Sequence, residues 1–272
     1  MKTLRFISLG LFAVLLGFAM VSFKKNFRCG VEKSATENRT FSVGGVEFTM
    51  VYVEGGTFMM GNNDADSCDS EKPVHHVTLS DYYIGETEVT QALWQAVMGT
   101  NPSWVKGDNL PVECVSWADC QNFIGKLNQI TGENFSLPTE AQWEFAARGG
   151  NYSKGYKYSG SNDIDAVAWC WINSAEFTHL VATKQANELG IYDMTGNVWE
   201  WCYDLFLPHS SVAVVDFPGF IYVCRGGSFK DEDFRADSGT CIDNTVICRC
   251  TSRRSGTPTE TSINLGLRLA LK

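Results

Sequence analysis

Little in this chain suits it to bind nucleic acids or nucleotides. Its 272 residues carry 22 Lys and Arg against 31 Asp and Glu, a net charge of −9. Nucleic-acid phosphates are bound through clustered Lys and Arg, so this composition argues against such partners. The sequence also lacks a P-loop and a Gly-x-Gly-x-x-Gly motif. No Ser/His/Asp arrangement of the hydrolase kind can be argued from it.

Histidine is scarce, with four residues in the whole chain. His75 and His76 are adjacent on a predicted strand, where neighbouring side chains point to opposite faces, so we do not expect them to share a metal. Tandem repeats and low-complexity tracts are also absent. One large domain is therefore the simplest organisation.

The N-terminus has the pattern of an export signal. Lys2 and Arg5 precede an uncharged apolar run from Ile7 to Phe23. This run is slightly short for a spanning helix. We predict a signal peptide or an uncleaved anchor over 1–23, a polar linker over 24–40 and the domain over 41–272. The protein is expected to be exported (periplasmic, cell-surface or secreted), with membrane contact only through an uncleaved N-terminal segment.

The chain has ten cysteines, and export would place them in an oxidising compartment. We therefore expect some of them to form disulfides, although their spacing does not give the connectivity. Others would be small buried hydrophobic residues, as we expect for Cys202 beside Trp201.

Secondary-structure signals are confined to the first half of the domain. Alternating residues from Phe41 onward predict strands. Helical spacing predicts helices over 87–98 and from Ser116 to about Ile130. Thr139-Glu140-Ala141-Gln142 is a capping box that begins a third helix. After Gly150, the sequence has few helix signals.

Several blocks occur in a specific order. They are Gly55–Gly61, Leu137–Gly150, Gly190–Trp201, Arg225–Phe229 and Asn264–Arg268. Together they resemble the formylglycine-generating enzyme (sulfatase-modifying factor) family. The resemblance implies an α+β, C-type-lectin-like fold with little regular secondary structure and few helices around small twisted antiparallel sheets.

The segment Asp193–Glu200 is the best candidate for a metal site. Asp193 and Glu200 supply carboxylates, and the Gly196-Asn197 turn can aim backbone carbonyls inward, as calcium requires. The resemblance implies a structural calcium at Asp193, Gly196, Val198 and Glu200. The alternative is a turn whose carboxylates cap local amides.

The family's oxidases bind copper(I) through two cysteines after the Gly-Gly-Ser turn and oxidise a substrate cysteine to formylglycine. Counting forward from Ser228 places Asp231 and Ala236 at these positions. Counting backward from Arg268 instead reaches Thr240 and Thr245.

An insertion therefore lies between the two flanking blocks, and neither count gives a cysteine pair. Because an oxygen ligand such as Asp231 poorly replaces a thiolate on copper(I), we expect no oxidase activity. The fallback thiols for a rearranged pair are Cys241, Cys248 and Cys250. Copper is expected only if the oxidase interpretation holds.

Four residues match positions that line the substrate groove in the family, namely Trp199, Ser228, Arg253 and Asn264. Each also has a structural interpretation, which we favour. Trp199 would be core, Arg253 would pair with an acidic neighbour, and Asn264 would hold a loop.

Two hypotheses about function remain open, the first of them in more than one version. In the first, which we favour, the chain is an exported binding or scaffold module for a protein, peptide or glycan, and has lost the oxidase chemistry. One version of it is the variable protein of a diversity-generating retroelement, and another is an accessory domain of the bacterial envelope. The alternative is an active copper-dependent oxidase that converts a sulfatase cysteine to formylglycine.

Overall fold

The structure is a computed structural model, and it describes residues 37–64, 67–207, 220–230 and 245–272. The proposed signal or anchor over 1–23 lies outside these residues, as does most of the linker. Residues 36–272 form one compact unit. Its first strand begins at Arg39, so the folded unit includes the last residues that were assigned to the linker. Within the described residues, no helix has the length and apolar character needed to span a membrane.

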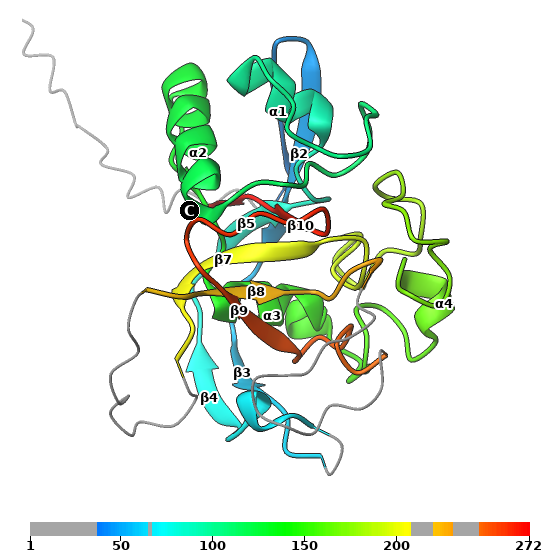
Figure 1. The fold of residues 1–272 in the computed structure, drawn as a ribbon. Helices are drawn as coiled ribbons and strands as arrows, with labels where there is room; N and C mark the ends of the chain where they lie inside the picture. Colours follow the sequence, from blue (N-terminus) through cyan, green and yellow to red (C-terminus); the bar gives the residue numbers. More distant parts are fainter. Residues whose placement is uncertain (1–36, 65–66, 208–219, 231–244) are drawn as a thin grey trace, which may run out of the picture. The chain divides into compact units, whose positions relative to one another are not determined.

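A five-stranded antiparallel sheet joins the two ends of the domain (Figure 1). Its strand order is β1-β2-β5-β11-β6. The strands are β1 (Arg39–Val43), β2 (Val46–Val53), β5 (Tyr82–Gly85), β11 (Ala270–Leu271) and β6 (Phe135–Ser136). The last strand, β11, thus lies between the central strand β5 and the edge strand β6.

A second sheet brings the family-like blocks together. Its order is β10-β7-β8-β9, with β10 and β7 parallel and the other pairs antiparallel. The strands are β10 (Leu265–Leu267), β7 (Trp199–Leu205), β8 (Tyr222–Arg225) and β9 (Arg253–Gly256). Glu200 on β7 lies opposite Arg225 on β8 and beside Gly266 on β10. A third, two-stranded sheet pairs β3 (Thr57–Met60) with β4 (His75–Thr78).

The helices follow their capping signals. They are α1 (Gln91–Met98), α2 (Trp117–Thr131), α3 (Glu140–Ala147) and the short α4 (Ile164–Val167), with 3-10 turns η1 (Asp69–Glu71) and η2 (Gly150–Tyr152). Ser116 caps α2, and Thr139 and Gln142 form the predicted capping box of α3.

The predicted start of the first helix at Thr87 is wrong. The segment before the helix instead pairs with the C-terminal region, where the Val89 N–H donates to the Leu267 carbonyl at 2.9 Å. Thr90 then caps α1 by accepting from the amide of Leu93. The long-range bond outweighs the local helical spacing.

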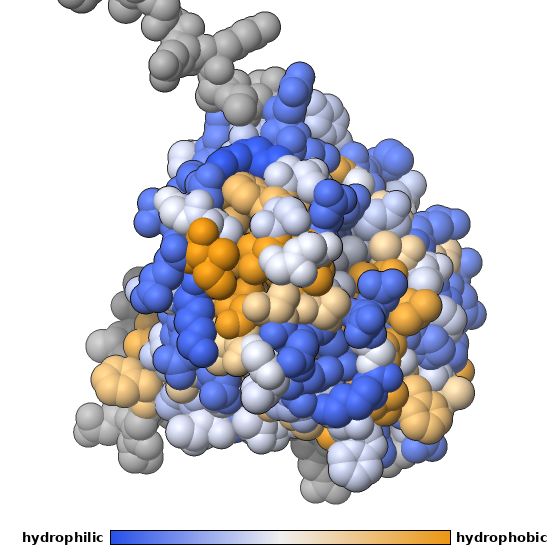
Figure 2. All heavy atoms as spheres, turned by 90° about the horizontal axis from the view of Figure 1, so that it is seen from above, coloured by the Kyte–Doolittle hydropathy of each residue, from blue (hydrophilic) through white to orange (hydrophobic). Residues whose placement is uncertain are grey.

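Large aromatic side chains fill the core, as expected for a fold with so much irregular chain. Trp199 and Trp201 belong to one cluster of buried residues, and Trp143 and Cys202 belong to another. Trp94 on α1 stacks on Phe123 of α2, with ring centroids 4.8 Å apart. Some apolar surface remains outside: Figure 2, which views the domain from the side of α1 and α2, shows an apolar patch bordered by hydrophilic residues.

Candidate ligand-binding site

The Gly-Gly-Ser turn after β8 is held by buried ion pairs. Arg225 is fully buried and pairs with Glu144 and, at 3.2 Å, with Glu140, both on α3. Gly226 and Gly227 follow with φ values of 105° and 73°, which L side chains rarely adopt. The charged pairs and the two glycines together fix the direction in which the chain leaves the sheet.

Two of the predicted groove residues meet at this turn. The Asn264 Nδ2 donates to the Ser228 Oγ at 2.9 Å and to the Lys230 carbonyl at 3.0 Å. The Ser228 Oγ also accepts from the Lys230 amide at 3.2 Å. Both side chains are buried. Their role visible in the structure is to hold the chain after the Gly-Gly-Ser turn.

The other two predicted groove residues are buried in structural contacts. Trp199 is in the core, and its amide donates to the Asn264 carbonyl at 2.8 Å. Arg253 makes a two-pronged ion pair with Glu140, with Nε and Nη2 at 2.7 and 2.6 Å from the carboxylate oxygens. Its Nη1 donates to the carbonyls of Ser70 and Leu207. These contacts correspond to the structural interpretation of Trp199 and Arg253.

A groove of about 480 Å³ opens beside the Ser228 turn. It is lined by Trp104, Val105, Glu113, Ala175, Glu176, Phe177, Thr178, Phe229, Lys230 and Ile263. Trp104 is 75% exposed and Phe177 is 56% exposed, so the groove offers two aromatic side chains to solvent. Sequence reasoning did not single out these two residues or Glu113, because they come from loops distant in sequence.

The proposed calcium residues lie in a buried acidic region. Asp193 has a φ of 57°, and its Oδ2 accepts from the Ala182 amide at 2.7 Å. Burial raises the pKa of Asp193 to about 6. Glu200 pairs with Arg268 at 2.7 Å and accepts from the Trp143 indole at 2.6 Å. Arg268 therefore compensates the charge of Glu200.

Glu88 adds a third buried carboxylate that the sequence did not indicate. It accepts from the Asn197 side chain at 3.2 Å and from the Val198 amide at 3.4 Å. Burial, together with the charges of Asp193 and Glu200, raises the pKa of Glu88 well above its ordinary value. Arg268 therefore does not fully offset the cost of ionising the buried carboxyl groups of Glu88 and Asp193. No group of three or more His, Cys, Asp or Glu is placed to hold a metal within the described ranges.

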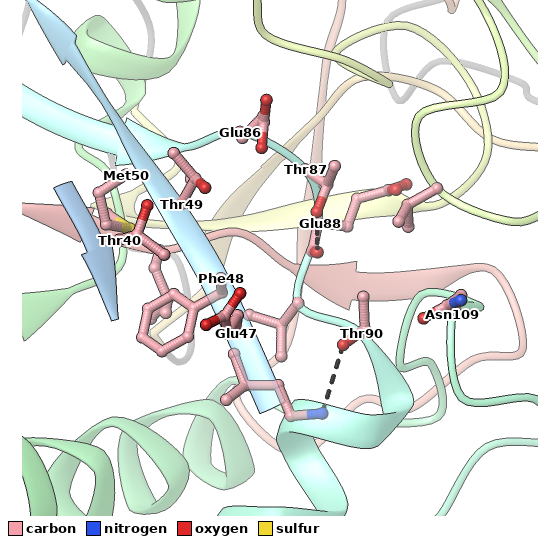
Figure 3. A pocket seen from close by; sticks show the side chains of 15 residues that line it. Thr40, Glu47, Phe48, Thr49, Met50, Glu86, Thr87, Glu88, Thr90 and Asn109 are labelled. Carbon is pink, nitrogen blue, oxygen red and sulfur yellow. Dashed lines mark hydrogen bonds between the residues drawn. The ribbon is translucent and has the colours of Figure 1, made fainter. Parts of the chain in front are cut away.

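Glu88 also lines a second cavity, of about 370 Å³. Figure 3 shows Glu86, Thr87 and Glu88 on the segment between β5 and α1, and Glu47 and Thr49 on β2. The residues that line this cavity include several carboxylates and hydroxyls, and none of them is Lys, Arg or His.

The expected cysteine positions are only partly visible. Asp231, Ala236 and Cys241 lie outside the described residues. Cys248 and Cys250 are buried thiols in different core clusters, and the Cys250 Sγ donates to the Ala147 carbonyl at 3.6 Å. Burial raises the pKa of Cys250 to about 12.

The thiol of Cys248 instead meets that of Cys170, a contact that no sequence spacing suggested. A hydrogen bond from Cys248 lowers the pKa of Cys170. A Cβ placed on Gly227 would lie 2.7 Å from the Cys248 Sγ, so this pair packs behind the Gly-Gly-Ser turn. No cysteine of the described chain lines the groove, and these thiols therefore do not fit the family's copper site. Cys68 is disulfide-bonded; the full disulfide map stays a prediction.

Comparison with known proteins places this arrangement in a family. The model of the sulfatase-modifying factor enzyme 1-like domain matches residues 37–272, a range that includes every residue that the structure describes. The chain belongs to this family. Its fold is accordingly the C-type-lectin-like variant that formylglycine-generating enzymes share, as the sequence predicted.

Three relatives illustrate its range. The formylglycine-generating enzyme of Streptomyces coelicolor is 30% identical over 292 residues, covering 81% of this chain and 88% of that protein. A chaperone protein named LppX, of Paenibacillus barcinonensis, is 38% identical over 205 residues, covering 57% of this chain and 71% of its own. The solved structure of Treponema denticola variable protein 1 superposes with a TM-score of 0.72 at 32% identity, covering 86% and 98% of the two chains.

Proposed function

We propose that this member of the family is an exported binding module without oxidase activity, and that the groove beside Ser228 receives its ligand. Membership in the family does not itself fix an activity, because one fold serves many functions. Relatives with names as different as enzyme, chaperone and variable protein support a role in binding. The N-terminal pattern of Lys2, Arg5 and the apolar run supports export.

One observation carries the proposal. The groove presents two exposed aromatic side chains, Trp104 and Phe177, and has no described cysteine in its lining. At the positions where the family's cysteines are expected, the forward count gives Asp231 and Ala236. The groove thus offers a surface suited to binding. Asp231 and Ala236 stand where the family's oxidases have the two cysteines that perform the oxidation.

We further propose a structural calcium at Asp193, Gly196 and Val198. The support is the closeness of two buried carboxyl groups, Asp193 and Glu88, whose raised pKa values reflect a lack of stabilising cations while Arg268 pairs with Glu200. Calcium prefers carboxylate and carbonyl oxygens, which this region supplies. With Glu200 engaged by Arg268, Glu88 is the better candidate for the second carboxylate.

An oxidase assay tests the central proposal. The purified domain would be loaded with copper(I) under oxygen and given a peptide bearing Cys-x-Pro-x-Arg, and the peptide mass would be followed. We expect an unchanged cysteine, while the related Streptomyces coelicolor enzyme, run in parallel, converts it. Conversion by this chain would refute the proposal. The variants Cys170→Ser and Cys248→Ser would then show whether these thiols perform the reaction.

The variable-protein hypothesis is a second candidate, supported by the Treponema denticola relative of that name. It requires the segment 231–244 or the groove lining to differ among copies of the gene. Sequencing the gene from many isolates, together with a search of the neighbouring DNA for a template repeat, tests it. Uniform sequences without a repeat would exclude it.

A further inference from the structure

The C-terminal half of strand β7 presents apolar side chains to solvent. The first residues of the strand, 199–202, are buried. Tyr203, Leu205 and Leu207 are then 56%, 37% and 47% exposed, and the residues between them are less exposed. Alternate residues of an extended chain lie on the same side, so these three side chains form a stripe. The exposed side of an antiparallel sheet usually carries polar residues, and this stripe is apolar.

Strand β8 extends the same surface. Tyr222 lies directly opposite Leu205 in the register, and Phe220, two residues earlier, is 70% exposed. Trp117 at the start of α2 stacks on Tyr222, with ring centroids 4.0 Å apart, and its ring lies 6.5 Å from that of Tyr203. In Figure 1, this end of the two strands reaches the margin of the domain. We call this surface the β7–β8 face, and it consists of Trp117, Tyr203, Leu205, Leu207, Phe220 and Tyr222.

The composition of the β7–β8 face matches the boundary of a lipid bilayer. None of its six residues is charged. Tyr203 and Tyr222 each combine an apolar ring with a hydroxyl group, and the Trp117 indole N–H donates to the Cys202 carbonyl at 3.0 Å. Tyr and Trp gather where a protein meets lipid headgroups, while Leu and Phe enter the apolar side of that boundary. The face contains both kinds of residue.

Its size and charge argue against a second copy of this chain as the partner. The four most exposed side chains of the face offer about 400 Å² of surface, given that an aromatic side chain presents about 200 Å². A stable protein–protein interface takes about 800 Å² from each partner. Two copies would also bring together two net charges of −9. A lipid surface requires no complementary shape, so a smaller apolar area is sufficient.

The chain before the domain is long enough to let this face reach a membrane. The apolar run near the N-terminus ends at Phe23, and β1 begins at Arg39. When extended, residues 24–38 could span up to about 50 Å. A domain of this size is roughly 45 Å across. An uncleaved N-terminal segment would therefore leave every face of the domain within reach of the same bilayer.

We propose that the β7–β8 face docks the domain on the surface of a lipid bilayer. Leu205, Leu207 and Phe220 would enter the boundary of the acyl chains, and the two tyrosines would lie among the headgroups. This contact is additional to the one expected of an uncleaved N-terminal segment. It also lies outside the ligand groove, because none of the six residues lines that groove. Since the chain is acidic, neutral headgroups are favoured over anionic ones.

The chain offers a matched pair of reporters for this contact. Tyr203 belongs to the face and is 56% exposed, while Tyr152 in η2 lies outside it and is 63% exposed. The full chain would be labelled with 3-fluorotyrosine and bound to phosphatidylcholine nanodiscs that contain some lipid with a nitroxide on its headgroup. Fluorine NMR then measures the broadening of each signal, and Tyr203→Phe and Tyr152→Phe assign the two signals. We expect the Tyr203 signal to broaden several times more than the Tyr152 signal.

Two variants test whether the apolar side chains cause this selectivity. In the double variant Leu205→Ser and Phe220→Ser, we expect the broadening of Tyr203 to fall to the level of Tyr152, with little change in the melting temperature. The control is Ile130→Ser, because Ile130 is 55% exposed at the far end of α2 from Trp117. This control should keep the selective broadening. If Ile130→Ser removes it as fully as the double variant, the assignment to the β7–β8 face is wrong.

Other results would overturn the proposal. Equal broadening of the two tyrosine signals in the unmodified chain would show a domain that is at most tethered by its N-terminus, without docking. Adding anionic phosphatidylglycerol to the nanodiscs should weaken the selective broadening, and a stronger effect would contradict an apolar contact. Sedimentation velocity without lipid should show a monomer. A dimer that the double variant dissociates would assign the face to a second copy of the chain instead of a bilayer.

Discussion

Removing the negative charge of Glu144 should strongly destabilise the domain, because this carboxylate pairs with Arg225, the residue directly before the Gly-Gly-Ser turn. Glu144 is fully buried and accepts from the Gly61 amide at 2.8 Å and from the Arg148 Nε at 2.9 Å, and it pairs with Arg225. In Glu144→Gln, the buried guanidinium of Arg225 keeps only Glu140 as its anion. Removing one partner of a buried pair costs about 3–5 kcal/mol.

Urea unfolding followed by tryptophan fluorescence would give the change in the free energy of unfolding. The control is Glu133→Gln, because Glu133 pairs with Arg39 at the surface, where the two side chains are 30% and 34% exposed. Such a pair contributes about 0–1 kcal/mol. If Glu144→Gln loses no more stability than this control, our account of the turn is refuted. Adding Arg225→Met to Glu144→Gln should recover part of the loss, because no unpaired charge then remains.

The same carboxylate predicts an acid dependence. Burial alone raises the pKa of Glu144, but the charges of Arg225 and Arg148 outweigh it, so the pKa lies below its ordinary value of 4.5. A depressed pKa stabilises the fold fully above the unfolded-state value, and this contribution is lost as the pH falls through the folded-state value. Glu144→Gln should therefore flatten the stability curve below about pH 4.5. An unchanged acid slope in the variant would contradict the assignment.

Two further predictions concern the other sites. Calcium should raise the melting temperature in differential scanning fluorimetry, and Asp193→Asn should remove this shift; an equal shift in the variant would place the ion elsewhere. Mild oxidation with diamide should join Cys170 to Cys248, with loss of two hydrogens detectable by peptide mapping, while the buried Cys120 stays reduced.

The parts of the fold that local chemistry specifies could be predicted. Ser116 and the Thr139–Gln142 capping box begin α2 and α3 as expected, because each cap satisfies amides of its own first turn. The start of α1 was misplaced, since the Val89 bond to Leu267 is invisible to local spacing. The four residues of α4 are too few to show a helical period.

The site was less predictable, because its parts come from separate loops. The resemblance brought out Ser228 and Asn264, and the structure shows them hydrogen-bonded. Trp104 and Glu113 carried no pattern that marks a binding residue. The Glu113 carboxylate accepts from the amides of Trp104 and Val105, an arrangement that only the folded loop determines.

One NMR titration tests the central claim most directly. The Cys-x-Pro-x-Arg peptide is added to the copper-loaded chain under oxygen, while the indole signal of Trp104, assigned with Trp104→Phe, and the peptide's own cysteine signals are followed. The account predicts that no aldehyde forms at the cysteine, whether or not the Trp104 signal shifts. A cysteine that becomes an aldehyde would show an active oxidase and contradict the account.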